Sequence, residues 1–364
     1  MNGLELARKY YEEAGRDALQ HIFPDLFNRM AIGLAGEGSE CFGFDDEISR
    51  DHDWGAAFCI WMDQEDYEKY GAAVQEVYNS LPAEIDGYPR RVSSSTAQGR
   101  DGVLCIQDWY RKYTGCPEGP QTLAQWRRVP EAFLATATNG EVFYDPSGKF
   151  TAIREHLQSY YPEDVRIKKI AARAAAMAQA GQYNFGRCVQ RGEYLAAELA
   201  KVEFLKAALS MVHLLNRKYA PFYKWMARSA KQMEKLPRAA SMLEQLSLLQ
   251  PAGDDGAAAV NLIERICALV TGELKRQGLL TRQDRAQVTP EGDLQLTPGD
   301  SGQNGAGDAS GTGAPAGGEA RPGNGTEISG TGEPEYSSFL LDLCPLIMQQ
   351  IADPYLRNSS FMQE

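Results

Sequence analysis

The sequence predicts an α+β protein, with an α/β domain over residues 1–150 followed by an α-helical bundle over residues 151–290. In the first part, short apolar runs typical of strands alternate with helical patterns, as in an α/β layer. From Thr151 onward this alternation ends, and the helix-favouring residues Ala, Leu, Glu, Lys and Arg dominate. A chain of 364 residues with 43% apolar side chains is long enough to form two domains.

The α/β domain is expected to begin with a helix over residues 2–28. Its candidate core contacts are Leu4, Leu6, Tyr10, Leu19 and Ile22. A short apolar strand over residues 29–35 then leads into a Gly-Ser turn, and a mostly apolar strand follows over residues 51–62. The remaining elements expected in this domain are a helix over 64–81, strands over 89–95 and 103–106, and helices over 122–138.

The second part reads as a bundle of helices. The expected helices cover residues 153–160, 165–180, 186–215 and 219–249, and, after a break over 251–256, residues 257–277. Residues 291–334 are rich in Gly, Ala, Ser, Thr and Pro, with few large apolar side chains. They are therefore expected to form a disordered linker, because such a composition buries too little surface to offset the ordering entropy.

A C-terminal helix is expected within residues 335–364. The segment from Tyr336 to Tyr355 is apolar again, with Phe339, Leu343 and Ile347 at intervals that suit a helix. An apolar helix face needs a partner surface. We expect this one to dock onto the bundle of its own chain, and the alternative is a partner protein.

The charge is unevenly placed along the chain. The net charge is −12, but residues 291–364 hold eleven acidic and two basic side chains, so the rest of the protein is near neutral. A near-neutral body does not favour broad binding to nucleic acid.

The seven cysteines include no Cys-x-x-Cys pair, and no apolar run approaches a membrane span. We therefore expect a cytoplasmic protein without disulfides, a zinc site or a membrane segment.

The most informative motif is Gly38-Ser39 followed by Asp51-His52-Asp53. On a strand, Asp51 and Asp53 would project from the same face, and paired carboxylates repel each other unless a cation lies between them. Oxygen-only ligands suit Mg²⁺, which is commonly held by one or two carboxylates together with substrate phosphates. The amides of the Gly-Ser turn suit a phosphate. The alternatives are an ordinary strand-to-helix turn for Gly38 and Ser39 and a polar turn for the two aspartates.

Two other phosphate-binding loops are excluded by spacing. No Gly-Lys-Ser/Thr follows the turn, as a Walker loop requires, and Cys41 stands where a dinucleotide-binding loop would place its third glycine.

The run Leu34-Ala-Gly-Glu-Gly-Ser39, with Asp51-His-Asp53 after it, resembles the signature of the polymerase-beta-like nucleotidyltransferase superfamily. The wider segment from Gly38 to Gly55 is similar to an uncharacterised bacterial branch related to kanamycin nucleotidyltransferase. Residues 139–145, Asn-Gly-Glu-Val-Phe-Tyr-Asp, and the segment from Leu215 to Trp225 resemble the same branch. The resemblance covers roughly residues 1–250.

This resemblance implies a catalytic domain with a mixed sheet, in which Asp51 and Asp53 hold Mg²⁺ and Gly38 and Ser39 hold the phosphates of ATP or another nucleoside triphosphate. It also implies a third carboxylate on a later strand. Asp101 and Asp108 flank the candidate strand over residues 103–106, and we favour Asp108. The alternative role for Asp108 is to cap a helix. Asp145, before Pro146, is interpreted as a structural turn residue.

A basic side chain from the second domain is expected to neutralise the triphosphate. Lys218 and Lys224 lie in the segment that resembles the family, and the alternative is that both are surface charges. Four aromatic residues are candidates to stack on a base unless they belong to the core: Tyr183, Tyr219, Phe222 and Trp225. Asp45, Asp46 and Glu47 form either a site for a cationic acceptor or a solvated loop.

The expected activity is transfer of a nucleoside monophosphate, AMP by preference, to a hydroxyl of a small molecule or a protein, with RNA the least favoured acceptor. The alternatives are an inactive nucleotide-binding or interaction module and a toxin–antitoxin component that modifies a protein. The C-terminal helix is the candidate contact for a protein partner.

Overall fold

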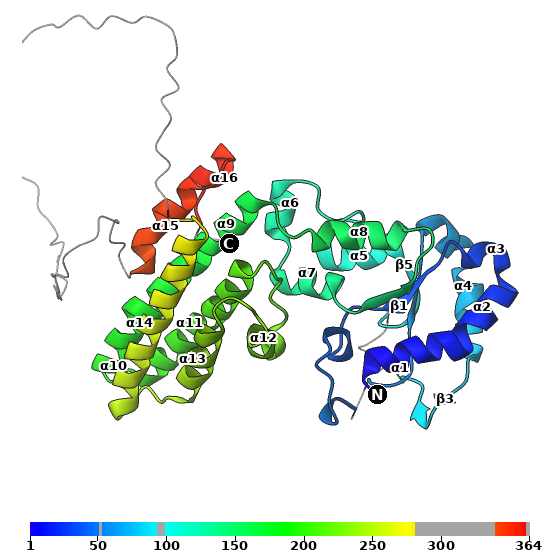
Figure 1. The fold of residues 1–364 in the computed structure, drawn as a ribbon, viewed down its shortest axis with the longest axis horizontal. Coiled ribbons are helices and arrows are strands. Elements are labelled where there is room, and N and C mark those ends of the chain that lie inside the picture. Colours follow the sequence, from blue (N-terminus) through cyan, green and yellow to red (C-terminus); the bar gives the residue numbers. More distant parts are fainter. Residues whose placement is uncertain (51–52, 93–98, 281–338, 362–364) are drawn as a thin grey trace, which may run out of the picture. The chain divides into compact units, whose positions relative to one another are not determined.

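The computed structural model describes residues 1–50, 53–92, 99–280 and 339–361 (Figure 1). Asp51, His52 and the predicted linker over residues 291–334 lie outside these ranges. The described residues belong to one unit by their contacts, so the domain boundary at residue 150 stays a prediction. No helix within the described ranges is long and apolar enough to cross a membrane.

A small mixed sheet lies at the centre of the N-terminal part. Its strands are β1 (Ala31–Leu34), β2 (Cys59–Met62), β5 (Gly102–Cys105) and β6 (Glu141–Tyr144). They lie in the order β5-β2-β1-β6, with β1 antiparallel to β2 and β6 and with β2 parallel to β5. A two-stranded sheet of β3 (Glu84–Ile85) and β4 (Tyr88–Pro89) lies apart from it. The fold class is therefore α+β with a mixed sheet, as predicted.

Successive side chains of β2 point to opposite faces of the sheet. Phe58, just before β2, and Ile60 belong to a core that the N-terminal helices and α4 build on one face. These helical segments are α1 (Gly3–Tyr10), η1 (Tyr11–Gly15), α2 (Arg16–Ile22), α3 (Pro24–Phe27) and α4 (Gln64–Ser80). On the other face, Trp61 stacks on Phe150 of α8 (Lys149–Gln158) at 4.0 Å and packs edge-on against Trp109 of α5 (Ile106–Thr114).

One expected core contact of the first helix is wrong. Leu6, Tyr10 and Leu19 are buried, but Ile22 is 51% exposed. The physical reason is that α2 ends at Ile22, where the backbone leaves the helical conformation at Phe23, so the side chain no longer follows the buried stripe.

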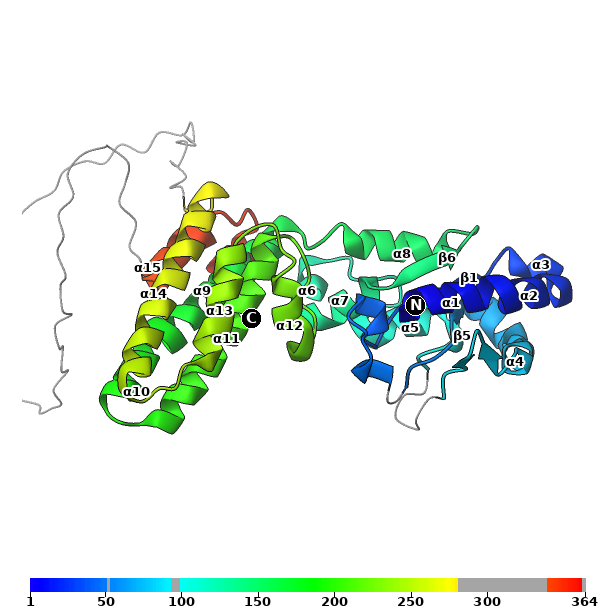
Figure 2. The same cartoon turned by 60° about the horizontal axis from the view of Figure 1, so that its bottom comes forward.

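From residue 149 to residue 280 the described chain is mostly helical, as expected from residue 151. Besides α8, the helical segments between α5 and residue 280 are α6 (Leu123–Arg128), α7 (Glu131–Thr138), α9 (Glu163–Met177), η4 (Ala178–Phe185), α10 (Gly186–Gln190), α11 (Tyr194–Leu215), α12 (Tyr223–Ala230), α13 (Pro237–Leu248) and α14 (Gly253–Arg276). Helix α11 packs against both α9 and α13 (Figure 2). Its buried side chains, which include Phe204 and Met211, form part of the core there.

The C-terminal apolar segment forms α15 (Leu340–Gln349) and α16 (Pro354–Asn358). Helix α15 packs along α9 (Figure 1) and buries Leu343, Cys344 and Ile347. The segment thus docks onto its own chain, which is the outcome expected from its apolar spacing.

Candidate functional site

The loop after β1 is held in place by a distant side chain. The Asn139 carboxamide accepts a hydrogen bond from the Gly36 amide and donates one to the Gly36 carbonyl, both at 2.8 Å. The amide of Gly140 donates to the Cys41 carbonyl at 2.7 Å. The segment around Asn139, which was singled out in the sequence, therefore fixes the glycine loop.

The Gly-Ser turn offers polar groups to a ligand. Gly38 has a φ of 135°, and Ser39 precedes the short 3₁₀ helix η2 (Glu40–Phe42). Within the described ranges, neither the amides of Gly38 and Ser39 nor the Ser39 hydroxyl forms a hydrogen bond. Both residues are half-buried. Backbone amides that lack a partner within the described chain can donate hydrogen bonds to an anion.

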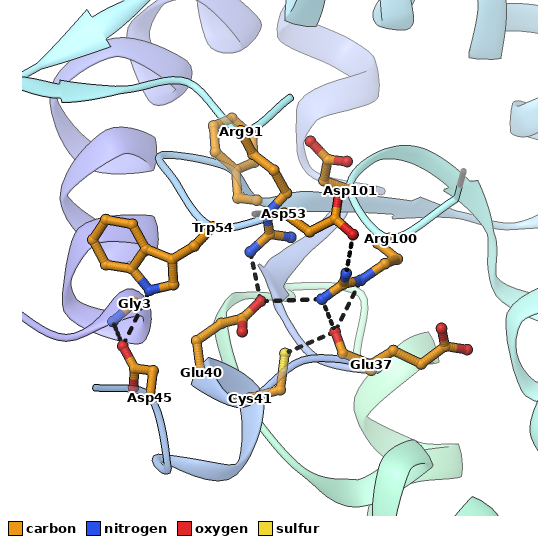
Figure 3. A network of polar contacts seen from close by, with 12 residues as sticks. Gly3, Glu37, Glu40, Cys41, Asp45, Asp53, Trp54, Arg91, Arg100 and Asp101 are labelled. Atoms are coloured by element: carbon orange, nitrogen blue, oxygen red, sulfur yellow. Dashed lines mark hydrogen bonds and ion pairs between the residues drawn. The ribbon is translucent and has the colours of Figure 1, made fainter. Parts of the chain in front are cut away.

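A buried ion network lies beside this turn (Figure 3). Arg91 and Glu40 form a buried pair, with Nη2 and Oε1 2.7 Å apart. Arg100 lies 3.5 Å from Glu40 and 3.5 Å from Asp53 and donates to the Glu37 carbonyl at 2.8 Å. Burial lowers the pKa of Arg91, but the nearby carboxylates of Glu40 and Asp101 outweigh it and raise that pKa above its usual value. Arg91 is therefore charged.

Asp53 joins this network, but not from a strand as the sequence suggested. Its φ of 53° lies in the left-handed region, and β2 begins only at Cys59. Gly55 explains the difference: a Cβ there would lie 2.6 Å from the Pro89 carbonyl oxygen, so only glycine lets that backbone approach. Ala56 pairs with residues 89–91, and this pairing positions Arg91. The bend at Asp53 replaces the expected strand.

The structure also places the two candidate third carboxylates. Asp108 is the third residue of α5, whose N-cap is Cys105, and its exposed side chain pairs with Arg111. Asp101 directly precedes β5 and accepts a hydrogen bond from the Tyr78 hydroxyl at 3.1 Å. Its charge also raises the pKa of Arg91, as described above. Asp101, and not Asp108, is thus the carboxylate that lies near the ion network.

A cavity of about 410 Å³ opens beside the Gly-Ser turn. It is lined by Glu37, Gly38, Phe42, Arg100, Thr136, Phe222, Tyr223, Lys224 and Trp225. This volume is in the range of small-molecule sites. Lys224 therefore shares a cavity with Gly38 and Arg100, although the three residues are far apart in the sequence.

Lys218 does not line that cavity. It lies at a separate hollow of about 270 Å³, together with Phe42, Tyr160 and Tyr219. Tyr219 stacks on Tyr160 at 4.7 Å, which agrees with a core role for this ring. Of the two predicted lysines, only Lys224 is brought to the glycine loop.

Helix α12 contacts the loop that follows the Gly-Ser turn. Arg228 of α12 donates to the Phe44 carbonyl at 2.7 Å, and the ring of Trp225 lies 5.5 Å from that of Phe44. The cavity wall that carries Lys224 is therefore fixed against the loop that carries Gly38.

The acidic loop is engaged in structural contacts. Asp45 accepts hydrogen bonds from the Gly3 amide at 2.7 Å and from the Trp54 indole at 3.2 Å. Hydrogen bonds from Ser49 lower the pKa of Asp46, with a smaller contribution from the charge of Arg228. Two of the three carboxylates considered for a cationic acceptor are thus already bonded within the chain.

The donor set around Asp53 suits a hard cation. The candidate ligands among the described residues are the carboxylates of Asp53 and Asp101. Burial raises the pKa of the nearby Cys59 thiol to about 12, so this thiol stays protonated and is a poor metal ligand. Carboxylate oxygens are the ligands that Mg²⁺ prefers. The described residues alone contain no group of three His, Cys, Asp or Glu side chains that could hold a metal ion, and Asp51 lies outside them.

Part of the chain matches a protein family. Residues 126–226 match a domain of unknown function, DUF4037. The match runs from α6 to α12, so it includes Asn139 and Lys224 but not the Gly38–Asp53 segment. No curated protein matches the chain.

Sequence reasoning missed Arg91, Arg100 and Glu40. No motif marks the two arginines, which come together with Glu40 only through the pairing at Ala56 and the start of β5. The one sequence feature that pointed to this network was the position of Asp101 at the edge of a predicted strand.

Proposed function

We propose that this protein is a Mg²⁺-dependent nucleotidyltransferase that moves a nucleoside monophosphate, AMP by preference, from a nucleoside triphosphate to a hydroxyl of a small molecule or protein. One observation carries the proposal. Gly38, Arg100 and Lys224 line a single cavity, and Arg100 lies 3.5 Å from Asp53. Amides that suit a phosphate, two cations and a carboxylate thus lie close to one another.

The triphosphate is assigned to the glycine side of the cavity. The amides of Gly38 and Ser39 suit its β- and γ-phosphates. Lys224 and Arg100 would neutralise the phosphate charge, since cations next to phosphate form strong charge-assisted hydrogen bonds. The rings of Phe222 and Trp225 offer a stacking surface for the base. Lys218 has no part in this assignment because it lies at another cavity.

Asp53, together with Asp51, is the proposed holder of Mg²⁺, which when bound would stabilise the charge that develops on the phosphates. In the transfer step, the acceptor hydroxyl oxygen forms a bond to the α-phosphorus. The bond from that phosphorus to the bridging oxygen breaks, and pyrophosphate leaves with the electron pair. The hydroxyl proton passes to a carboxylate, and Asp101 is the better candidate because it lies near the ion network, whereas Asp108 is exposed and paired with Arg111.

A second candidate is a nucleotide-binding module without turnover. The ion pair between Arg100 and Asp53 favours it, because a guanidinium there partly neutralises the carboxylate that a metal would need.

The test uses α-labelled ATP, GTP, CTP and UTP with Mg²⁺ and cell lysate. Wild type is expected to transfer label to one class of molecule, and Asp53→Asn to lower transfer roughly a hundredfold or more, the usual scale for losing charge stabilisation of the transition state. Asp108→Asn is the matched control and should keep wild-type transfer, since its side chain is exposed and paired with Arg111.

Each outcome separates the candidates. Label on a protein supports modification of a protein partner, including the toxin–antitoxin role, and label on a small molecule supports small-molecule modification. Bound triphosphate without label on anything supports the inactive module. Transfer that survives in Asp53→Asn contradicts the site assignment.

A further inference from the structure

Helix α11 exposes apolar side chains on the side opposite its core contacts. Leu195, Leu199 and Val202 are 76%, 62% and 47% exposed. Phe204 and Met211, which lie about half a turn around the helix from Val202, are buried. A helix that is apolar on all sides is normally covered on all sides. The exposed side of α11 therefore marks an interaction surface.

The exposed stripe has the spacing of a helix-pairing seam. Intervals of four, three, four and three residues separate its positions, which are Leu195, Leu199, Val202, Lys206 and Leu209. All of these except Lys206 are apolar, and apolar positions at such intervals pack against a second helix in coiled coils. The stripe ends at the half-buried Leu209, because Ser210 and His213 are buried. The surface thus fits a partner helix of about two heptads.

The sequence of this stripe is nearly symmetric about Val202. It begins with Leu-Ala-Ala-Glu-Leu over residues 195–199 and ends with Leu-Lys-Ala-Ala-Leu over residues 205–209. The second run read backwards reproduces the first, except that Lys206 stands in place of Glu198. At about 100° per residue, the two members of each matched pair lie at equal angles on either side of Val202. Two antiparallel copies of α11 thus place each residue opposite its match.

The one mismatch brings opposite charges together. In an antiparallel pair centred on Val202, Lys206 of one copy lies opposite Glu198 of the other. Both side chains are accessible, with exposed fractions of 59% for Lys206 and 36% for Glu198. Each also has a partner within its own chain, since Lys206 lies 3.0 Å from Glu203. Glu198 lies 2.9 Å from Lys201.

These partners leave room for the contact between copies, because a carboxylate accepts several hydrogen bonds and an ammonium donates three. A parallel pair would instead place Lys206 opposite Lys206, which is unfavourable. The charges therefore favour the antiparallel arrangement.

The other candidate cover for this surface is the chain's own segment over residues 281–338, which lies outside the described ranges. Its sequence is rich in Gly, Ala, Ser, Thr and Pro and has few large apolar side chains. Such a segment offers little apolar area to pack against exposed aliphatic side chains. A self-complementary pattern, in contrast, is what a two-fold interface requires, because residue i of one copy contacts residue j of the other and j contacts i.

We infer that two copies of this protein associate through α11, as an antiparallel pair of helices with its two-fold axis at Val202. This pairing does not rest on the proposed transfer activity. Since residues 195–209 span only about 21 Å, the interface is short. Small interfaces are usually weak, so we expect a Kd on the order of 10 µM.

Sedimentation of the full chain tests the association. The mean mass should rise from 40.1 kDa toward twice that value as the concentration increases from about 1 to about 100 µM. Val202→Glu places two carboxylates face to face on the axis and should keep the protein monomeric over this range. Ile48→Glu, at an apolar residue outside α11 that is also exposed, is the matched control and should associate as wild type does.

Crosslinking tests the position of the axis. Residue 202 of one copy faces residue 202 of the other, so Val202→Cys should form a disulfide between copies under mild oxidation. A disulfide requires Cα atoms within about 7 Å. The two copies of residue 195 would lie about 21 Å apart along the helices, so Leu195→Cys should not link them. Wild type, with its seven native cysteines, gives the background.

Charge reversal tests the antiparallel register. Glu198→Lys places lysines opposite each other at both ends of the pair, and Lys206→Glu places glutamates there. Each variant alone should raise the Kd about tenfold. A mixture of the two variants restores opposite charges at both contacts and should associate about as tightly as wild type. Urea midpoints of the two variants, measured below the Kd, check that each still folds.

Three results would overturn the inference. The first is a wild-type protein that stays monomeric at all concentrations, which would leave another protein or the chain's own segment as the cover of α11. The second is equal crosslinking of Leu195→Cys and Val202→Cys. The third is a mixture of Glu198→Lys and Lys206→Glu that associates no better than either variant alone, although both are folded.

Discussion

Three neighbouring residues, Gly38, Glu40 and Arg91, depend on one another at the candidate site. A Cβ on Gly38 would lie 2.4 Å from the Glu40 carboxylate. Glu40 has little freedom to move away, because it is 3% exposed and bonded to Arg91 at 2.7 Å. The absence of a side chain at residue 38 thus lets a buried ion pair lie directly beneath the proposed phosphate site.

His213 carries a prediction about pH. Its Nδ1 lies 2.7 Å from the Leu209 carbonyl, which can only accept, so Nδ1 carries the proton and Nε2 accepts the Ser229 hydroxyl at 2.9 Å. Burial lowers the pKa of this imidazole below 6.5. The unfolded chain therefore binds the proton first, and the free energy of unfolding should fall as the pH drops from about 7.5 to about 5.5.

Urea denaturation at a series of pH values tests this expectation. His213→Gln should flatten the pH dependence across that window, and His21→Gln, at an exposed position, should not. A His213→Gln variant with the wild-type slope would show that another group is responsible.

At this scale the sequence predicted the residues that belong to a local motif and missed those that long-range pairing brings together. Gly38 and Lys224 were identified from their segments and line one cavity. Arg91 and Arg100 could not be identified, because they reach Glu40 only once residues 89–91 have paired beside Ala56 and β5 has formed. The sequence alone cannot separate Asp101 from Asp108, because the surroundings of the two carboxylates differ only after folding.

At the scale of elements, the helices depart from regular geometry where a glycine meets a phenylalanine. The two π-helical segments, η1 and η4, contain Gly15 and Gly181. A Cβ on Gly15 would lie 2.5 Å from the Phe58 ring, and one on Gly181 would lie 2.3 Å from the Phe204 ring. Such wide turns are rare and interrupt an otherwise regular helix.

Gly181→Ala is expected to destabilise the protein by about 1–3 kcal/mol, because the methyl group overpacks the contact with Phe204. Gly272 in α14 is the matched control, since a Cβ there meets nothing within 4 Å among the described atoms. Gly272→Ala should be stabilising by about 0.5–1 kcal/mol, because alanine favours a helix. The measurement is the urea midpoint of each variant, and equal midpoints would contradict the packing argument.

Element type was predictable where the apolar spacing was strong, and element ends were not. The helix expected over residues 64–81 is α4, and the strand expected over residues 29–35 is β1. The segment expected as one helix from Tyr336 to Tyr355 divides instead at residues 350–353. There Asp353 caps a new helix that begins at Pro354, a residue suited to a first turn because it has no amide hydrogen to bond.

At the scale of the whole molecule, α15 and α16 both pack against α9. Lys168 of α9 is buried and donates a hydrogen bond to the Leu356 carbonyl of α16. Lys168→Met keeps an unbranched side chain but removes the ammonium group, so the Leu356 carbonyl loses this donor. We expect the free energy of unfolding to fall by about 1–3 kcal/mol.

Hydrogen exchange gives a local readout of the same change. In Lys168→Met the amides of residues 353–359 should exchange faster, and those of β2 should not. Lys206→Met, at an exposed ion pair, serves as the control and should change stability by less than about 0.5 kcal/mol. Unchanged exchange over residues 353–359 would show that α16 is held without Lys168.

The late return of α15 to α9 has a consequence for how the protein is made. A ribosome completes the bundle up to residue 280 before it adds the segment that covers α9, and roughly sixty residues separate the two. At about 5–20 residues per second, the apolar surface of α9 stays uncovered for about 3–12 s. During that interval the nascent chain exposes an apolar helix face that can aggregate with other chains. The yield of the protein in the cell should therefore depend on chaperones more than the stability of the folded protein would suggest.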